Sequence, residues 1–224
     1  MNWQAITLTL RLACWVAGIL LIIGLPIAYW VAYSRWRWKF IVEAVVALPI
    51  VLPPTVLGFY VLMAIGNHGW VGKIWQSMFD RRLAFTFPGL VIASVLYSLP
   101  FAVQPFAAGF SSVDRKLIEA SWTLGASKLR TFFRVIAPLS FTGILTGIVL
   151  SFAHTLGEFG VVLMVGGNIE GVTRTVSIDI YDNVQAFNYQ GAGETALLLL
   201  VFSFAALSVV YALNRRMWGA SLGK

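Results

Sequence analysis

Long apolar runs alternate with short charged segments along the chain, and this alternation dominates the sequence. Five runs are long enough to cross a bilayer, because a transmembrane helix needs about 20 predominantly apolar residues. They lie at residues 12–34, within 44–73, within 83–113, at 135–157 and at 195–214. The pattern predicts an all-α, polytopic helical membrane protein with about five transmembrane helices, which form a single transmembrane domain over residues 1–224.

The second run contains a cluster of prolines, Pro49, Pro53 and Pro54. Each proline removes one backbone donor, and such broken backbone is tolerated at membrane depth only beside protein or a wet cavity. A helix that restarts at Pro54 would present free N–H groups near Thr55 and Val56, together with the positive end of its dipole. This end suits an anion. The alternative is that the break only shapes helix packing.

A polar island at residues 111–138 interrupts the apolar pattern. It is predicted to form two short helices, with Ser112 or Asp114 as the first N-cap and Ser127 as the second. Gly125 can end the first helix in a left-handed turn, and Pro138 resets the backbone before the next run. The island is too charged to insert into a membrane and too short for a domain, so its apolar side chains need a partner surface.

The island resembles the cytoplasmic loop signature of ATP-binding-cassette importer permeases. Glu119, Ala120, Gly125 and Pro138 match that signature at the right spacing, Ser121 replaces a second alanine, and two further positions carry apolar replacements. The resemblance implies that Glu119 and its small neighbours contact a separate ATP-binding subunit. A plain interfacial hairpin between two membrane helices is the alternative.

Composition and charge agree with this class. Hydrophobic residues make up 59% of the chain and charged residues 11%, and the formal net charge is +7. In a membrane protein a positive balance concerns sidedness rather than nucleic acid, because basic residues gather on the cytoplasmic side. Placing the island in the cytoplasm puts the N-terminus outside and the C-terminus inside. The same side then holds most of the basic residues: Arg35, Arg37, Lys39, Arg115, Lys116, Lys128, Arg130, Arg134, Arg215, Arg216 and Lys224.

Two segments narrow the family further. The double proline at Pro53 and Pro54, with Gly58 four residues later, and the segment 156–160 resemble the molybdate-transporter permeases. Sulfate permeases lack the double proline in the same form. The resemblance favours molybdate as the transported anion, with tungstate or sulfate as alternatives. It also marks Pro53, Pro54, Thr55 and Gly58 as candidates for the translocation pathway or its gate.

His154 and Glu158 lie four residues apart, so the fourth run places them on one helical face. Ionisable groups inside a membrane indicate function by default. Glu158 follows Pro138 by about 30 Å of helix, which predicts a place at the outer interface. A carboxylate repels an oxyanion, so a gate or a packing role is favoured for this pair. Gln104, near the inner end of the third run, is expected to contact a neighbouring helix.

The segment between the fourth and fifth runs is predicted to hold a short amphipathic helix on the outer surface. Val176, Ile180, Val184 and Phe187 form its apolar face, and Asp179 lies on the polar face. This helix is a candidate docking surface for an external protein. A simple surface cover is the alternative.

Catalytic motifs are missing from the sequence. It has no glycine-rich phosphate loop followed by Lys and Ser or Thr, and two His and one Cys do not match a metal site. We therefore expect no enzyme activity and no bound cofactor, with ATP and Mg²⁺ on a partner. The resemblance implies two ATP-binding subunits, an extracytoplasmic oxyanion-binding protein, a second copy of the chain and the bacterial inner membrane. A proton-coupled secondary transporter is the competing class.

Overall fold

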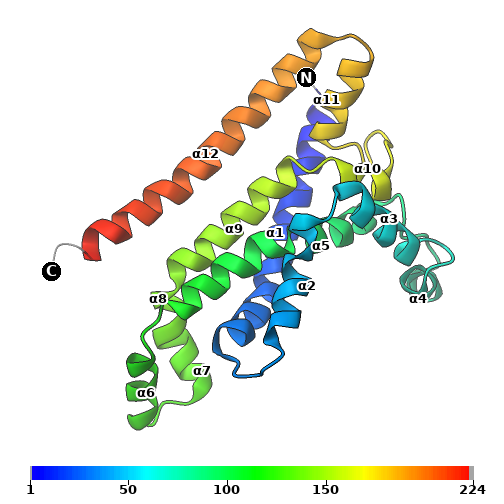
Figure 1. Ribbon diagram of the computed structural model, residues 1–224. Helices are drawn as coiled ribbons and strands as arrows, with labels where there is room; N and C mark the ends of the chain where they lie inside the picture. Colours follow the sequence, from blue (N-terminus) through cyan, green and yellow to red (C-terminus); the bar gives the residue numbers. More distant parts are fainter. Residues whose placement is uncertain (1, 222–224) are drawn as a thin grey trace.

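The apolar runs form helices that pack around α5 (Phe87–Ser111). The computed structural model in Figure 1 describes residues 2–221, with side chains described as far as residue 212. Every regular element in this part of the chain is a helix, which confirms the predicted all-α class. α1 (Trp3–Tyr33) and α9 (Phe141–Leu156) pack on α5. The buried core between α1 and α5 is formed by Leu12, Val16, Leu20, Val103, Phe106 and Phe110.

Three helices are long and apolar enough to cross a membrane alone: α1, α5 and α12 (Tyr189–Ser221). Two bent helix pairs raise the number to five if each pair counts as one crossing, in agreement with the five predicted runs. The first apolar run is predicted to begin at residue 12, directly after Arg11, but α1 begins at Trp3 and includes Arg11. Its guanidinium carbon lies 4.8 Å from the centre of the Phe87 ring.

The second apolar run is not one straight crossing. α2 (Lys39–Val51) and α3 (Pro54–Ile65) meet at a bend of 112°. Leu52 and Pro53 between them have extended backbone angles, so the helical hydrogen-bond ladder stops there. Pro54 can then begin a new helix, since the first helical position needs no N–H partner. The predicted break is confirmed, and its size turns the run into a broken or re-entrant segment.

The fourth run also differs from its prediction. α7 (Lys128–Thr131) continues into a π-helical turn over Phe132–Ile136 and a short helix, α8 (Ala137–Leu139). The axis then bends by 71° before α9. The pattern predicts a helix that crosses from residue 135, but the crossing helix begins at Phe141. The π-helical turn and Pro138 divert the chain before that point.

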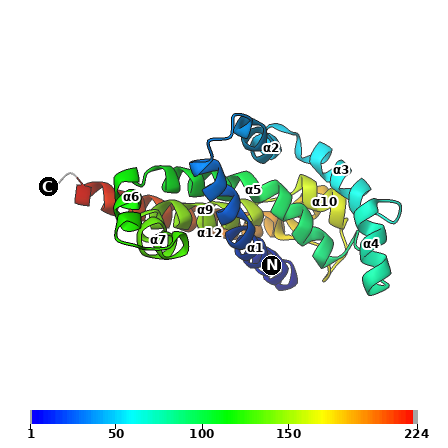
Figure 2. The ribbon, with the colours of Figure 1, turned by 90° about the horizontal axis from the view of Figure 1, so that it is seen from below.

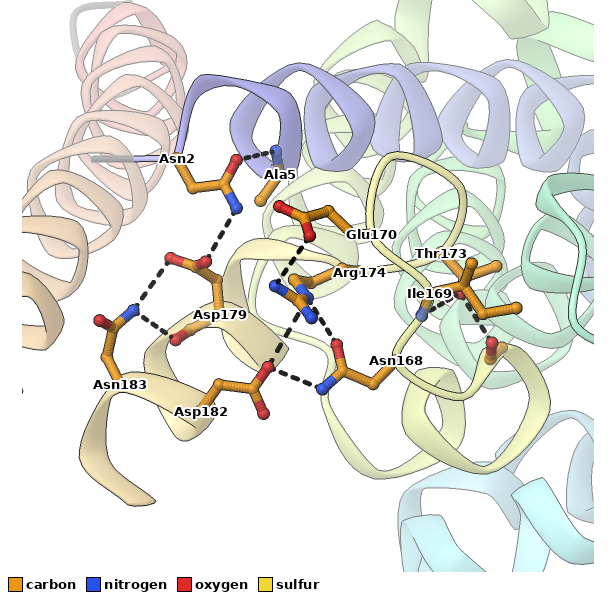
Figure 3. A network of polar contacts seen from close by, with 11 residues as sticks. Asn2, Ala5, Asn168, Ile169, Glu170, Thr173, Arg174, Asp179, Asp182 and Asn183 are labelled. Atoms are coloured by element: carbon orange, nitrogen blue, oxygen red, sulfur yellow. Dashed lines mark hydrogen bonds and ion pairs between the residues drawn. The ribbon is translucent and has the colours of Figure 1, made fainter. Parts of the chain in front are cut away.

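The loop between α10 (Gly160–Gly166) and α11 (Val176–Gln185) is held by the polar contacts in Figure 3. The Arg174 guanidinium donates to Asn168 Oδ1 at 2.6 Å and lies 3.6 Å from an Asp182 oxygen. The start of α1 joins this network, because Asn2 donates to Asp179 at 3.0 Å.

The predicted faces of the outer helix are wrong in part. Val176 is buried as expected, but Asp179 is buried as well, where it accepts the bond from Asn2. Val184 and Phe187 are exposed, with 80% of the Phe187 surface accessible. The reason is that α11 is anchored by its N-terminal end, where the Val176 N–H donates to Thr9 Oγ1 of α1 at 2.9 Å. Its C-terminal turn extends beyond the bundle.

The remaining helices lie at the ends of the molecule. α4 (Trp70–Phe79) follows α3 at one end, and α6 (Arg115–Thr123) lies beside α7 at the other, as Figures 1 and 2 show. α12 runs alongside α9 (Figure 1), and only 11% of its apolar window is buried. The side chains of Arg215 and Arg216, and all of Lys224, lie outside the described part of the chain, so the C-terminal basic cluster stays a prediction.

Candidate functional site

The restart of the chain at α3, after the break from α2, and the junction between α9 and α10 line an open cavity of about 600 Å³, called the break cavity here. Its wall combines residues from the start of α3, the middle of α5 and the junction of α9 with α10. The residues that line this cavity include Pro54, Thr55, Tyr97, His154, Gly157 and Glu158. The structure therefore brings together four of the six residues that the sequence marked as pathway candidates. Pro53 precedes α3 directly, and Gly58 lies one turn into it.

Gly58 and Gly160 explain how α3 approaches α10 so closely. A Cβ atom on Gly58 would lie 2.8 Å from Cβ of Met164, and one on Gly160 would lie 2.8 Å from Cβ of Pro54. Contacts that short do not occur between side-chain carbons, so both positions need glycine. Gly58 thus lets α3 pack closely on α10, and it does not itself line the cavity.

A chain of hydrogen bonds fixes the ring of His154. Thr155 Oγ1 donates to the Ser151 carbonyl at 2.8 Å, so its single proton is used. Ser98 Oγ, 3.0 Å from Thr155 Oγ1, must then be the donor of that bond. Ser98 has no second proton, so His154 Nδ1 donates to it at 3.0 Å. This assigns the Nδ1–H tautomer. The ring stacks on Phe101 with 3.9 Å between centroids.

Glu158 lies beyond the end of α9, because the helix stops at Leu156 and Gly157 follows as its C-cap. The predicted shared helical face with His154 is therefore wrong, although both residues line the break cavity. The predicted exposed place at the outer interface is also wrong. Only 3% of Glu158 is accessible, and both carboxyl oxygens lack a hydrogen-bond partner among the described residues. The Ser94 hydroxyl beside it is buried too.

For the anion uptake that the sequence resemblance implies, replacing Glu158 by glutamine should leave the rate close to wild type. A buried charge without a partner is costly, so the site gains little from ionisation, and the amide keeps the shape of the side chain. Glu158→Ala should lower uptake roughly tenfold, because it leaves a void between α5 and the break. Initial uptake rates and complex melting temperatures check this. Equal losses in both variants would show that the acid itself is required.

The predicted anion cradle at the start of α3 is only partly present. The Val56 N–H is not free, since it donates to the Pro53 carbonyl at 2.9 Å. The Thr55 N–H keeps no partner within the described chain, and Thr55 lines the break cavity. The helix start therefore offers one backbone donor to the cavity rather than two.

The α6–α7 hairpin, residues 115–131, forms as predicted at its turns. The Asp114 side chain accepts from the Lys116 N–H, and Ser127 Oγ accepts from the Arg130 N–H. Gly125 has a φ of 77°, the left-handed conformation that glycine adopts most easily. The Ala126 N–H donates to the carbonyl of Ser121 at 3.1 Å, which completes a Schellman motif around Gly125.

The surface of the hairpin carries exposed apolar side chains among its charged ones. Glu119 and Ala120 are exposed, whereas Ser121 is half-buried and its hydroxyl lies 3.0 Å from Thr131 Oγ1. Ser121 thus joins the two helices. Pro138 is exposed in α8, beyond the hairpin itself. The large apolar side chains exposed on the hairpin or directly after it are Leu117, Trp122, Leu124, Leu129 and Phe133, with 87% of Leu124 accessible.

Contacts of Tyr29 and Tyr33 hold α1 against α5 and against the π-helical turn that follows the hairpin. The Tyr33 hydroxyl donates to the Phe110 carbonyl at 2.8 Å, and the Tyr29 ring lies 5.6 Å from the Phe132 ring in an edge-to-face arrangement. Ile118 is buried against the same core. Sequence reasoning missed these anchors, because aromatic residues at the end of an apolar run look like ordinary interfacial anchors. Ser94 and Ser98 were missed as well, although their spacing of four within an apolar run is a signal.

Both regions lie within a match to a known family. Residues 24–219 match the family described as binding-protein-dependent transport system inner membrane component. The chain belongs to this family. A relative, the molybdenum transport system permease protein ModB of Azotobacter vinelandii, is 49% identical over 97% of the chain and 96% of the relative. The probable sulfate transport system permease protein cysT of Chlorella vulgaris is 32% identical over 96% of the chain and 81% of that protein.

A solved structure confirms the fold. An inward-facing form of the MetNI methionine ABC transporter matches with a TM-score of 0.74 and covers 96% of this chain and 95% of the matched chain. The sequence identity is 15%, so this likeness concerns the fold alone. The overall helical arrangement is therefore one that a solved transporter structure shares.

Proposed function

We propose that this chain is the membrane-spanning permease of an ATP-driven importer that moves molybdate into the cell. The observation that carries the proposal is the 49% identity to a molybdenum permease over nearly the whole of both chains. Local chemistry supports it. The break cavity is lined by Thr55, whose N–H has no partner among the described residues, and by the fixed ring of His154, whereas both oxygens of the lining Glu158 are buried.

ATP hydrolysis would take place on a separate subunit. The α6–α7 hairpin carries exposed leucines on a segment too polar to sit in the membrane, so a cleft on a peripheral protein suits it. Two ATP-binding subunits would each receive one hairpin of a permease homodimer. Glu119 and Ala120 would lie in the contact, and Gly125 would turn the chain away from it. An oxyanion-binding protein would deliver the anion on the opposite side.

Uptake of labelled molybdate by vesicles that contain the permease and its ATP-binding subunit tests this function. We expect uptake that requires ATP and the external binding protein, is competed by tungstate and is little affected by excess sulfate. Molybdate and tungstate have nearly the same size and charge, so electrostatic interactions distinguish them poorly. Efficient competition by sulfate would reassign the substrate. Uptake driven by a proton gradient without ATP would refute the importer class.

The orientation of the chain can be tested by cysteine labelling in a Cys14→Ser background. The proposal places Ser127 of the hairpin in the cytoplasm and Gln185 of α11 outside, and both are exposed. A membrane-impermeant maleimide added to intact spheroplasts should label Gln185→Cys and leave Ser127→Cys unlabelled. Inverted vesicles should give the reverse pattern. Labelling of Ser127→Cys from outside would overturn the topology.

A further inference from the structure

Gln104 is a polar side chain in a place where the structure gives it no protein partner. It lies on α5 about 26 Å from the start of the helix and about 10 Å from its end, which is within the hydrocarbon depth of a bilayer. The residue is exposed, and the described residues make no hydrogen bond to it. Within a single chain no hydrogen bond joins Gln104 to a neighbouring helix, so the predicted contact stays a prediction. An amide facing lipid is costly, so this surface must meet water, substrate or another copy of the chain.

Gln104 continues a face of α5 that begins at the break cavity. Tyr97 lines the cavity, and Phe101 holds the His154 ring. Gln104 follows Phe101 by three residues and Ala108 follows Gln104 by four, so all four share one side of the helix. Ala108 and Ser111 are exposed like Gln104. This face, defined by residues 97, 101, 104, 108 and 111, runs from the cavity to the end of α5 next to the hairpin.

The chemistry of this face suits an anion in transit. None of its side chains carries a charge, and the amide of Gln104 supplies two N–H donors in its middle. A guanidinium or an ammonium group would hold a dianion strongly, whereas conduction requires binding weak enough for the anion to leave. A carboxylate would repel it. A neutral amide binds the anion weakly enough to release it and does not repel it.

We propose that Gln104 is the residue that contacts the transported oxyanion in the inner half of the pathway, on the 97–111 face of α5. This inference rests on the proposed function, because the path is taken to run between two copies of the chain. The two copies would present their Gln104 side chains to the same space. The anion would pass from the break cavity along this face to the hairpin side.

Thiol accessibility tests the placement. In a Cys14→Ser background, Gln104→Cys should react with a water-soluble thiol reagent at least about tenfold faster than Ile22→Cys, and molybdate during turnover should slow it. Ile22 is a matched control, since it lies at a similar depth on α1 and is 73% exposed among apolar neighbours. Equal, slow reaction of both cysteines would place Gln104 in lipid or in a dry interface and overturn the proposal.

Uptake kinetics test the role. Gln104→Leu should lower the maximal rate roughly tenfold with an unchanged KM for the loaded binding protein, and Gln104→Asn should retain part of the rate. Homodimer and ATPase association should be the same in both variants, so a loss of assembly would reveal a packing role instead. If wild-type vesicles import no molybdate but Gln104→Cys reacts rapidly, the proposed substrate is wrong, whereas the place of Gln104 on a water-accessible pathway is supported. If molybdate enters and Gln104→Leu matches wild type, only this inference fails.

Discussion

Replacing Gly125 by valine is expected to abolish ATP-driven uptake while leaving the membrane helices folded. Gly125 closes α6 in the left-handed conformation, with a φ of 77°. A β-branched residue there is disfavoured by roughly 1–2 kcal/mol, and that strain would disrupt the Schellman motif that joins α6 to α7. The exposed leucines would then lose their fixed arrangement. Uptake rate and recovery of the ATP-binding subunit with the purified permease measure the effect.

Gly125→Asn is the matched control, because asparagine tolerates the left-handed region far better than valine. Nothing lies within 4 Å of a Cβ atom placed at Gly125, so neither substitution creates a clash within the chain. Asn should therefore retain most of the uptake. Two variants with the same loss would point to a direct clash with the partner, and two variants with wild-type coupling would refute the hairpin as the transmission element.

Substituting both Pro53 and Pro54 by alanine should lower uptake by at least about tenfold while the complex still assembles. Alanine restores the backbone donors and favours helix, so the 112° bend between α2 and α3 would tend to straighten. Straightening would withdraw Thr55 from the break cavity and move residue 54 away from Gly160, which Pro54 contacts in the wild type. Uptake rates of the intact complex, with its composition verified after purification, provide the measurement.

Pro49→Ala is the control that distinguishes the loss of the bend from the general effect of removing a proline. Pro49 is buried inside α2, and the helix continues past it, so its replacement should change uptake little. If the double variant transports at the wild-type rate, the break is a matter of packing, and the cavity has no part in transport. An equal loss in the Pro49 variant would indicate that rigidity of α2, rather than the bend, is required.

Local features of the structure could be predicted from the sequence because they depend on neighbouring residues. The helical class follows from the apolar runs, and the turns of the hairpin follow from Asp114, Gly125 and Ser127. Capping and left-handed turns are interactions within a few residues, so they can be recognised without tertiary contacts. The break before Pro54 belongs to the same group, since a proline acts on its own backbone.

Tertiary packing decided the features that combine distant segments. The angle between α2 and α3 depends on where α10 lies, and Gly160 is more than 100 residues away from Pro54 in sequence. The same holds for Glu158, which is buried only because α9 ends two residues earlier and turns it toward Ser94 of α5. The tautomer of His154 requires Ser98 from another helix. Periodicity within one run carries no information about these partners, so the sequence by itself determined the helices, their caps and the break, whereas only the folded structure determined which of their side chains form the cavity.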